Sequence, residues 1–322
     1  MLQLIFSSEF FFAILRITAP ILLVTLAADI CEKAGVSNIG LEGTMMISAL
    51  FGSLFAYYAS NWFVGLLVAV VTGIIVSLVM GFFAFNLKTN IILTGTAINM
   101  VGSGGTIFLV KVITGITEGS QMTSTSGLIT GNLQIPVWNI PLIKDIPVIG
   151  SILSGHCILT YVAFLLVYLT WVLLYRTPLV LNIRSVGENP NAASSVGVSV
   201  IKVKYTAFIL AGVLAGLSGA YMSMYYAMGW SQNMVAGRGF IALAAEAMGS
   251  GEPVGSMLAA LIFGFAQALS VKVSSLGVNS FLVSPIPYAV TIIGLVVFAL
   301  LHNSKAKKAH SSQTVEKKKA NN

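Results

Sequence analysis

Long apolar runs separated by short polar connections dominate the pattern of this chain. A helix needs about 20 mostly apolar residues to cross the hydrocarbon core of a bilayer. Eight runs approach that length, at residues 10–30, 39–59, 62–85, 91–114, 157–175, 206–228, 254–271 and 286–302. A ninth run, at 239–249, is too short to span alone and suits a half-helix, a re-entrant segment or the second part of a broken helix. The pattern predicts an all-α, polytopic transmembrane helical bundle with about 8–10 membrane segments.

Composition supports a membrane protein and excludes several other classes. Of the 322 residues, 57% are hydrophobic and only 8% are charged, and the mean hydropathy is +0.92. Soluble domains carry about 25% charged residues, because their surface must be solvated. The chain is therefore not a soluble enzyme, a disordered protein or a secreted disulfide-rich scaffold.

The net charge of +7 is concentrated at the C-terminal end. Residues 303–322 carry six lysines and one glutamate, which is 6 − 1 = +5, so the rest of the chain carries +2. Such a polar, basic end predicts a solvated, disordered cytoplasmic tail that can also touch anionic membrane lipid. The same argument disfavours a nucleic-acid-binding arm, and we expect no nucleic-acid partner.

Basic residues in the connections predict the orientation of the bundle, because cytoplasmic loops are enriched in Lys and Arg. The 176–205 connection has four basic residues and one acidic residue, and Lys88 lies in the short 86–90 turn. The long 115–156 connection has one basic and two acidic residues among many Ser, Thr, Gly and Pro. We therefore expect a transmembrane domain over residues 1–302, with 176–205 and the C-terminus cytoplasmic and 115–156 external.

Two stretches depart from the pattern of regular membrane helices. Residues 35–43 and 237–246 are both interrupted by Gly, both contain a single Glu, and both adjoin apolar helices rich in small residues. Irregular backbone at membrane depth occurs only where protein buries it or where it lines a cavity. Because the two stretches occupy matching places in the two halves of the chain, they indicate a transport pathway with broken or re-entrant elements near 35–45 and 237–249.

Polar residues inside the apolar segments are the candidates for that pathway. Glu42 and Glu246 are carboxylates within apolar stretches, where a charge costs about 2.5–3.5 kcal/mol at the membrane centre. Each can alternatively be structural, by accepting hydrogen bonds from helix N-terminal amides or by meeting Arg238 or Lys33. Asn99 lies in the middle of a span and can either bind a polar solute or hold a neighbouring helix.

The 187–198 segment predicts a short helix on the cytoplasmic face. Asn189 suits its N-cap, Pro190 its first helical position and Gly197 its C-terminal stop. Capping at both ends is more than a simple connector needs, which favours a rigid helix that docks into a partner. The chain contains no Gly-Lys dipeptide and hence no G-x-x-x-x-G-K-[ST] phosphate loop, so any ATP must be used by another chain.

Residue types that carry other chemistry are scarce. Cys31 and Cys157 do not form a disulfide framework, and the three histidines are scattered, so we expect no metal site. No acid–base pair or nucleophile arrangement points to an intramembrane enzyme. An ion-coupled secondary carrier, with Glu42 and Glu246 as coupling sites, is a competing interpretation that the capped cytoplasmic helix disfavours.

Three motifs, in order along the chain, resemble those of the permease subunits of bacterial ABC importers. They are Asn38-Ile39-Gly40-Leu41-Glu42-Gly43, Gly187-Glu188-Asn189-Pro190-Asn191-Ala192-Ala193 and Gly239-Phe240-Ile241-Ala242-Leu243-Ala244-Ala245. The family is the one that includes the ribose and branched-chain amino acid permeases. The first motif is similar to the form found in its branch for nucleosides or simple sugars, which is served by a lipoprotein of the basic membrane protein type. Glu246 departs from the family pattern, in which an apolar residue is more usual.

The resemblance implies a membrane-spanning permease subunit of an ATP-driven, binding-protein-dependent importer. Nucleosides are the first expectation for the solute, and simple sugars or branched-chain amino acids are the alternative. Such importers lie in the bacterial plasma membrane and combine two permeases, usually different chains for nucleosides, with cytosolic ATPase subunits and an extracellular solute-binding lipoprotein. The ATPase would bind ATP-Mg, so this chain is expected to be no enzyme and to bind no cofactor.

Together, the motifs and the residue-level arguments define two candidate sites. The candidates for the substrate pathway are Asn38, Glu42, Asn99, Phe240 and Glu246. The candidates for the ATPase-coupling helix are Glu188, Asn189, Pro190, Asn191, Ala192 and Gly197.

Overall fold

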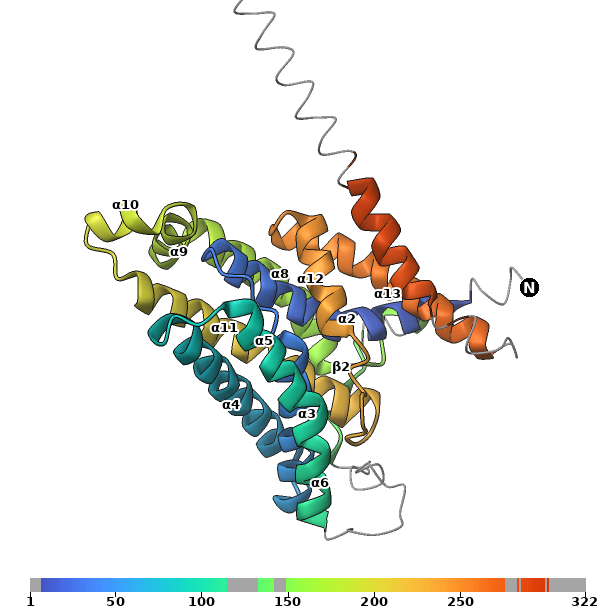
Figure 1. Ribbon diagram of the computed structural model, residues 1–322. Coiled ribbons are helices and arrows are strands. Elements are labelled where there is room, and N and C mark those ends of the chain that lie inside the picture. Colours follow the sequence, from blue (N-terminus) through green and yellow to red (C-terminus); the bar gives the residue numbers. More distant parts are fainter. Residues whose placement is uncertain are drawn as a thin grey trace, which may run out of the picture.

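The chain folds into a bundle of helices, with one small two-stranded sheet in the part that the structure describes (Figure 1). This computed structural model describes residues 7–114, 133–141, 149–275, 283, 285–298 and 300. The first half contains α2 (Ser8–Lys33), α3 (Leu41–Tyr58), α4 (Trp62–Gly81), the π-helix η1 (Phe82–Asn86), α5 (Ile91–Met100), the π-helix η2 (Val101–Gly105) and α6 (Thr106–Thr114).

The second half begins with the strands β1 (Val137–Trp138) and β2 (His156–Cys157), which pair antiparallel on either side of the short helix α7 (Ile149–Leu153). The helices that follow are α8 (Ile158–Arg176), α9 (Pro178–Glu188), α10 (Pro190–Ser195), α11 (Val200–Tyr221), the π-helix η4 (Met222–Tyr226), α12 (Arg238–Gly249), α13 (Pro253–Ser275) and a final helix, Ile286–Phe298.

Six of the described helical stretches are long and apolar enough to cross a membrane. They are Ser8–Lys33, Trp62–Asn86, Ile91–Ile113, Ile158–Arg176, Val200–Tyr226 and Pro253–Ser275. α3 and the final helix correspond to two further apolar runs, and α12, with 12 residues, is the short ninth run. The prediction of an all-α polytopic membrane bundle is therefore confirmed.

Helix α2 lies at the centre of the bundle, with α8, α11, α12 and α13 packed around it. Its Pro20 has no N–H to donate to the carbonyl one turn earlier. Tyr221 of α11 compensates, because its hydroxyl donates to that Arg16 carbonyl oxygen at 2.9 Å. Ser218 of α11 donates to the Pro20 carbonyl oxygen at 2.8 Å. These two bonds satisfy backbone that lipid cannot satisfy, and they attach α11 to α2.

Helices α3, α4 and α11 pack on one another with close backbone contacts. A Cβ atom at Gly73 of α4 would collide with the carbonyl oxygen of Gly212 in α11, so the two helices touch where both residues are small. The outer side of α4 carries Leu67, Val71 and Ile75, each about half exposed. A large apolar surface of this kind suits contact with lipid.

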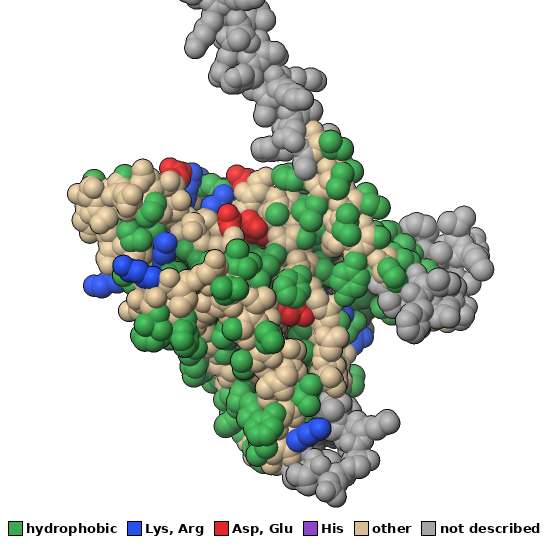
Figure 2. Space-filling view, viewed as in Figure 1, with side chains coloured by type: hydrophobic (Ala, Val, Ile, Leu, Met, Phe, Trp, Pro, Cys, Tyr) green, Lys and Arg blue, Asp and Glu red, His purple; other side chains and the backbone are tan. Residues whose placement is uncertain are grey.

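The basic connections meet at one end of the bundle. Tyr205, at the start of α11, donates to Asn86 Oδ1 at 2.6 Å, and Gly187 at the end of α9 packs against the turn after Lys33. Lys and Arg side chains gather toward α9 and α10 in Figure 2. Since α8 runs from β2 to α9, the two-stranded sheet lies at the opposite end. The predicted tail 303–322 and most of the predicted external connection lie outside the described residues.

Candidate functional site

The two interrupted segments of the sequence meet in the structure through Glu42. Its Oε1 accepts a hydrogen bond from the backbone N–H of Gly237 at 2.8 Å, and its Oε2 accepts one from Gly239 at 2.6 Å. Gly237 precedes α12 with a φ of +76°, a left-handed conformation that favours glycine. The carboxylate at the start of α3 thus caps the N-terminus of α12, and this geometry matches the structural interpretation of Glu42.

Asn99 holds the other side of the first interrupted segment. Its Oδ1 accepts from the N–H of Gly43 at 2.7 Å, and its Nδ2 donates to the Ile39 carbonyl oxygen at 2.9 Å. Gly102 of η2 lies directly against Gly43: a Cβ atom at Gly102 would collide with the Gly43 backbone, and one at Gly43 would collide with the Ile98 carbonyl of α5. The amide therefore satisfies irregular backbone at membrane depth, as such backbone requires.

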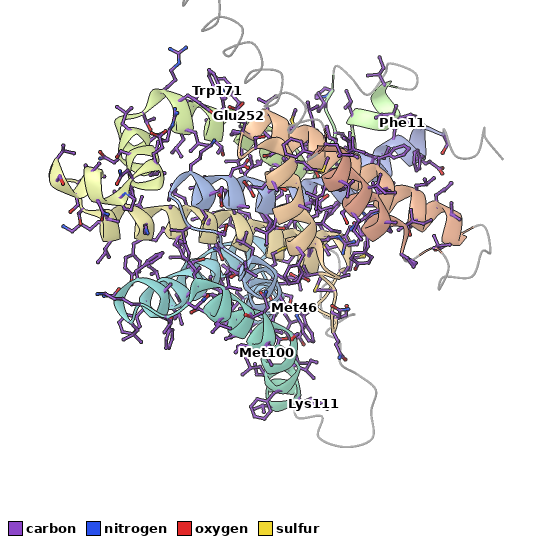
Figure 3. The ribbon with its side chains drawn as sticks, turned by 45° about the horizontal axis from the view of Figure 1, so that its top comes forward. Phe11, Met46, Met100, Lys111, Trp171 and Glu252 are labelled. Atoms are coloured by element: carbon purple, nitrogen blue, oxygen red, sulfur yellow. The ribbon has the colours of Figure 1, made fainter. Side chains whose placement is uncertain are left out.

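A groove of about 310 Å³ opens beside these contacts. It is lined by Glu42, Gly43, Met46, Thr96, Asn99, Met100, Ser103, Asn233, Gly237 and Phe240. Figure 3 shows Met46 of α3 and Met100 of α5 on this side of the bundle, with Lys111 toward the far end of α6. The lining combines hydroxyl and amide groups with two thioethers and one aromatic ring, which suits a solute with both polar and flat apolar parts.

The structure brings together three of the five predicted pathway residues. Glu42, Asn99 and Phe240 line the groove, and Phe240 is 49% exposed. Asn38 is buried, and its Oδ1 accepts from the Gly40 N–H at 3.1 Å, so it shapes the turn before α3. Glu246 lies near the other end of α12, where its carboxylate and the Lys33 ammonium both approach Gly251. Neither Asn38 nor Glu246 lines the groove.

Sequence reasoning missed several residues that line the groove. Thr96 and Ser103 lie on the same face as Asn99, spaced by three and four residues along one apolar span. A polar stripe at helical spacing is a signal that could have identified them. Met46, Met100 and Asn233 carried no comparable signal, because their place in the groove depends on how three separate elements pack.

Two arginines lie close together near the start of α12, on either side of the Tyr226 ring. Arg238 is buried, and it donates to the carbonyl oxygens of Met234 and Val235 at 3.2 and 3.1 Å. Its guanidinium lies 5.1 Å from the centre of the Tyr226 ring, and that of Arg16 lies 5.2 Å from the same ring. Backbone carbonyls and an aromatic ring therefore stabilise both charges, as membrane cations require. The alternative pairing of Arg238 with a glutamate is not formed among the described residues.

The predicted coupling helix is present as α10. The Asn189 side chain accepts from the N–H groups of Asn191 and Ala192 at 3.1 and 3.0 Å, Pro190 occupies the first turn, and Gly197 follows with a φ of +87°. The local prediction of a capped helix is therefore confirmed. Asn189, Pro190, Asn191, Ala192 and Gly197 are all exposed, as is Glu188, whose carboxylate lies 4.0 Å from the Arg184 guanidinium.

Helix α9, which precedes α10, was not predicted. Val180, Ile183 and Val186 are buried against the bundle at a three-residue spacing, while Asn182, Arg184 and Glu188 are exposed. Beside α9 a recess of about 320 Å³ connects the ends of α2, α9 and α12. It is lined by Glu32, Lys33, Arg184, Gly187, Glu188 and Ser250. The pair α9–α10 thus presents a rigid, polar surface at one end of the bundle.

The described residues contain no group of three or more His, Cys, Asp or Glu side chains that could hold a metal ion. Cys31 and Cys157 are both buried and free. The polar groove and the α9–α10 surface are the described parts of the structure that contain the site residues predicted from the sequence.

Comparison with known proteins gives a consistent family. The family model for the branched-chain amino acid transport system permease component matches residues 10–301. The guanosine ABC transporter permease protein NupQ of Bacillus subtilis is 36% identical over 301 residues, which cover 89% of this chain and 90% of that protein. The nucleoside ABC transporter permease protein NupC of Lactococcus lactis is 32% identical, with a match that covers 87% of this chain and 89% of that protein. The nucleoside ABC transporter permease protein NupB of the same bacterium is 24% identical, with a match that covers 94% of this chain and 84% of that protein. No solved structure matches.

Proposed function

The chain belongs to this family of transport permeases, and we propose that it is the membrane-spanning subunit of an ATP-driven, binding-protein-dependent importer for nucleosides. The observation that carries the solute class is the 36% identity to a guanosine permease over 89% of the chain. That match includes all the elements that build the groove, so the groove is the natural place for the solute to pass.

The chemistry of the groove fits a nucleoside. Phe240, Met46 and Met100 offer soft, apolar surfaces against which a flat base can pack. Thr96 and Ser103 offer hydroxyl groups that can meet sugar hydroxyls. The side chains of Glu42 and Asn99 are already bonded to backbone, so their part is to hold the walls of the pathway.

Energy for transport would come from a separate ATPase. The chain lacks the phosphate loop that ATP use requires, and it presents α10 as an exposed, capped helix. Lys and Arg gather at the α9–α10 end, which the positive-inside rule makes cytoplasmic. The ATPase would therefore dock at this end in the bacterial plasma membrane, with the C-terminus on the same side, and a solute-binding lipoprotein would deliver the nucleoside at the opposite end.

The proposed function is tested by uptake in cells that lack the gene for this chain. We expect loss of labelled guanosine uptake, restoration by the wild-type gene, and competition by other nucleosides but not by ribose or leucine. Competition by ribose or leucine alone would identify a different solute class.

A second measurement tests the source of energy. The purified chain alone in liposomes should neither accumulate guanosine in an ion gradient nor hydrolyse ATP. Accumulation by the lone chain would instead identify a secondary carrier.

A further inference from the structure

Two connections of the chain touch at a pair of glycines near the α9–α10 end. Gly187, in the last turn of α9, faces the turn that follows α2. A Cβ atom at Gly187 would collide with the Lys33 carbonyl oxygen and would lie 3.1 Å from the Gly35 nitrogen. A Cβ atom at Gly35 would lie 3.0 Å from the Gly187 Cα atom, and Gly35 has a φ of +69°. The two backbones are therefore in direct contact, which leaves no room for a side chain at either glycine.

The turn after α2, residues 34–40, is a rigid segment. The N–H groups of Ala34, Gly35 and Val36 donate to carbonyl oxygens in the last turn of α2 at 3.0, 2.8 and 3.1 Å. The side chains of Ala34, Val36 and Asn38 are buried. A segment with paired amides and buried side chains resists local opening, so a force on one part of it moves the whole turn.

The same turn leads directly to the walls of the groove. Glu42, two residues beyond the turn, caps α12 through the amides of Gly237 and Gly239. Helix α5 also packs on the turn, since a Cβ atom at Gly95 would lie 2.9 Å from the Gly40 nitrogen. A displacement of the turn therefore reaches α3, α5 and α12, the three helices that converge at the groove.

On the other side of the contact, Gly187 is fixed to α10. It lies two residues before Asn189, which is the C-cap of α9 and the N-cap of α10. The Asn189 N–H donates to the Ser185 carbonyl oxygen of α9 at 3.0 Å. Because the two helices share this residue, a shift of α10 moves the end of α9. The alternative route runs through the 22 residues of α11 and reaches the groove only by way of η4 and the loop before α12.

We propose that Gly187 is a positioning residue for transport, because its contact with Gly35 carries the position of α10 to the groove. The glycine that opens the motif at 187–193 thus serves an internal contact, while the exposed residues of α10 remain available to the ATPase. The inference rests on the proposed importer function and adds the route that connects its two sites.

Reconstitution of the complete transporter in proteoliposomes tests this route. Gly187→Ala should leave the ATPase bound, because α10 itself is unchanged, but should raise the ATP hydrolysed per nucleoside imported by at least about threefold. Gly216→Ala on α11 is the matched control, since a Cβ atom there would lie 2.6 Å from the Ala69 carbonyl oxygen of α4. It should lower the Tm without changing the ratio of ATP to nucleoside, because it lies outside the route.

A double variant tests the contact itself. Gly35→Ala and Gly187→Ala disturb the same contact, so the double variant should have nearly the same ratio as the stronger single variant. Effects that multiply in the double variant would show that the two glycines act separately, which contradicts the proposed contact.

A measurement on the wild-type transporter does not depend on how the variants fold. Hydrogen exchange at the Gly35 and Val36 amides should change by at least about threefold when a nonhydrolysable ATP analogue binds the ATPase. Unchanged exchange at this turn, in a transporter that imports nucleoside, would overturn the inference.

The ratio of ATP to nucleoside decides between the two routes. A wild-type ratio for Gly187→Ala would overturn the inference, and a raised ratio for Gly216→Ala alone would place the route in α11. Failure of the wild-type transporter to import nucleoside when ATP is supplied contradicts the proposed function instead, so the two failures are distinguishable.

Discussion

At the scale of single residues, Glu42 is the link on which the two interrupted segments depend. A carboxylate at membrane depth is costly unless hydrogen bonds stabilise it, and here two backbone amides do so at 2.8 and 2.6 Å. In return, the carboxylate satisfies two amides at the start of α12 that have no partner inside their own helix. One side chain therefore compensates for irregular backbone in two parts of the chain that lie 195 residues apart.

Replacement of Glu42 by Gln tests this link. A Gln side chain offers one acceptor oxygen and one NH₂ donor, so one of the two backbone amides would face a donor. We expect the free energy of unfolding to fall by about 1.5–3 kcal/mol, measured as a lower Tm in detergent, together with reduced nucleoside uptake. Glu246→Gln is the control, with a change within about 0.5 kcal/mol, and equal effects of the two variants would contradict the capping role.

Phe240 is the groove residue best suited to contact the solute directly. Phe240→Ala should lower nucleoside uptake by about fivefold or more, because base–aromatic stacking is worth about 1–3 kcal/mol. Phe240→Tyr should retain uptake, since the ring is kept. Phe63 of α4 is 50% exposed, nearly the same as Phe240, and Phe63→Ala should leave uptake unchanged. An equal loss for both alanine variants would point to a general effect of truncating an exposed ring.

His156, which lies outside the membrane spans, makes the free energy of unfolding depend on pH. It is buried against Phe12, its Nε2 donates to the Ile152 carbonyl oxygen at 2.9 Å, and burial lowers its pKa below the usual 6.5. The unfolded chain therefore takes up this proton at a higher pH than the folded chain does. We expect the free energy of unfolding to fall below about pH 6.5, by up to about 1.4 kcal/mol per pH unit, until the folded pKa is passed. His156→Gln should remove this component from a plot of Tm against pH.

The sequence pattern identified Glu42 and Glu246 as candidate residues but did not distinguish their roles. Glu42 and Glu246 occur in equivalent sequence contexts, and the sequence supports the same two roles for both. The structure separates them, because Glu42 meets the α12 amides while Glu246 lies near Lys33 at the other end of that helix. This difference arises from the packing of α3 on α12, which no local pattern encodes.

At the scale of elements, the part of the fold that depends on local signals could be predicted. The α10 caps involve residues within three positions of one another, so Asn189 and Pro190 identify the helix from sequence. Helix α9 depends instead on burial of Val180, Ile183 and Val186 against the bundle, within a segment that carries basic residues. Its charge suggested a loop, and only tertiary contact reveals its apolar face.

Two adjacent alanines in α10 allow the proposed docking of the ATPase to be tested separately from folding. Ala192 is exposed, and Ala193 is buried with 3% exposure. Ala192→Arg should leave Tm and membrane insertion intact but uncouple transport, seen as loss of ATPase co-purification or of nucleoside uptake in the same cells. Ala193→Arg should destabilise the chain itself, because it buries a charge. Normal ATPase binding and normal uptake with Ala192→Arg would show that α10 is only a connector.

At the scale of the whole molecule, the arrangement of charges and the order of helices define one direction across the membrane. Lys33 at the end of α2, Arg184 in α9 and Lys204 at the start of α11 lie toward the α9–α10 end, while β1 and β2 lie at the opposite end of α8. Apolar length was sufficient to locate the spans, since each must match the same bilayer thickness, but only six of the eight predicted runs form described helices long and apolar enough to cross a membrane. The groove was not predictable, because it forms where α3, α5 and α12 converge from distant parts of the chain.

This direction predicts which surfaces are reached from outside the cell. Cys31 and Cys157 are buried, so an introduced cysteine reports its own position with little background. Asn139→Cys, exposed next to β1, should react with a membrane-impermeant maleimide in intact cells. Ala192→Cys on α10 should react only after permeabilisation, because the positive-inside rule places the basic end in the cytoplasm. Labelling of Ala192→Cys in intact cells, with Asn139→Cys protected, would reverse the orientation and place the ATPase-docking surface on a side that has no ATP.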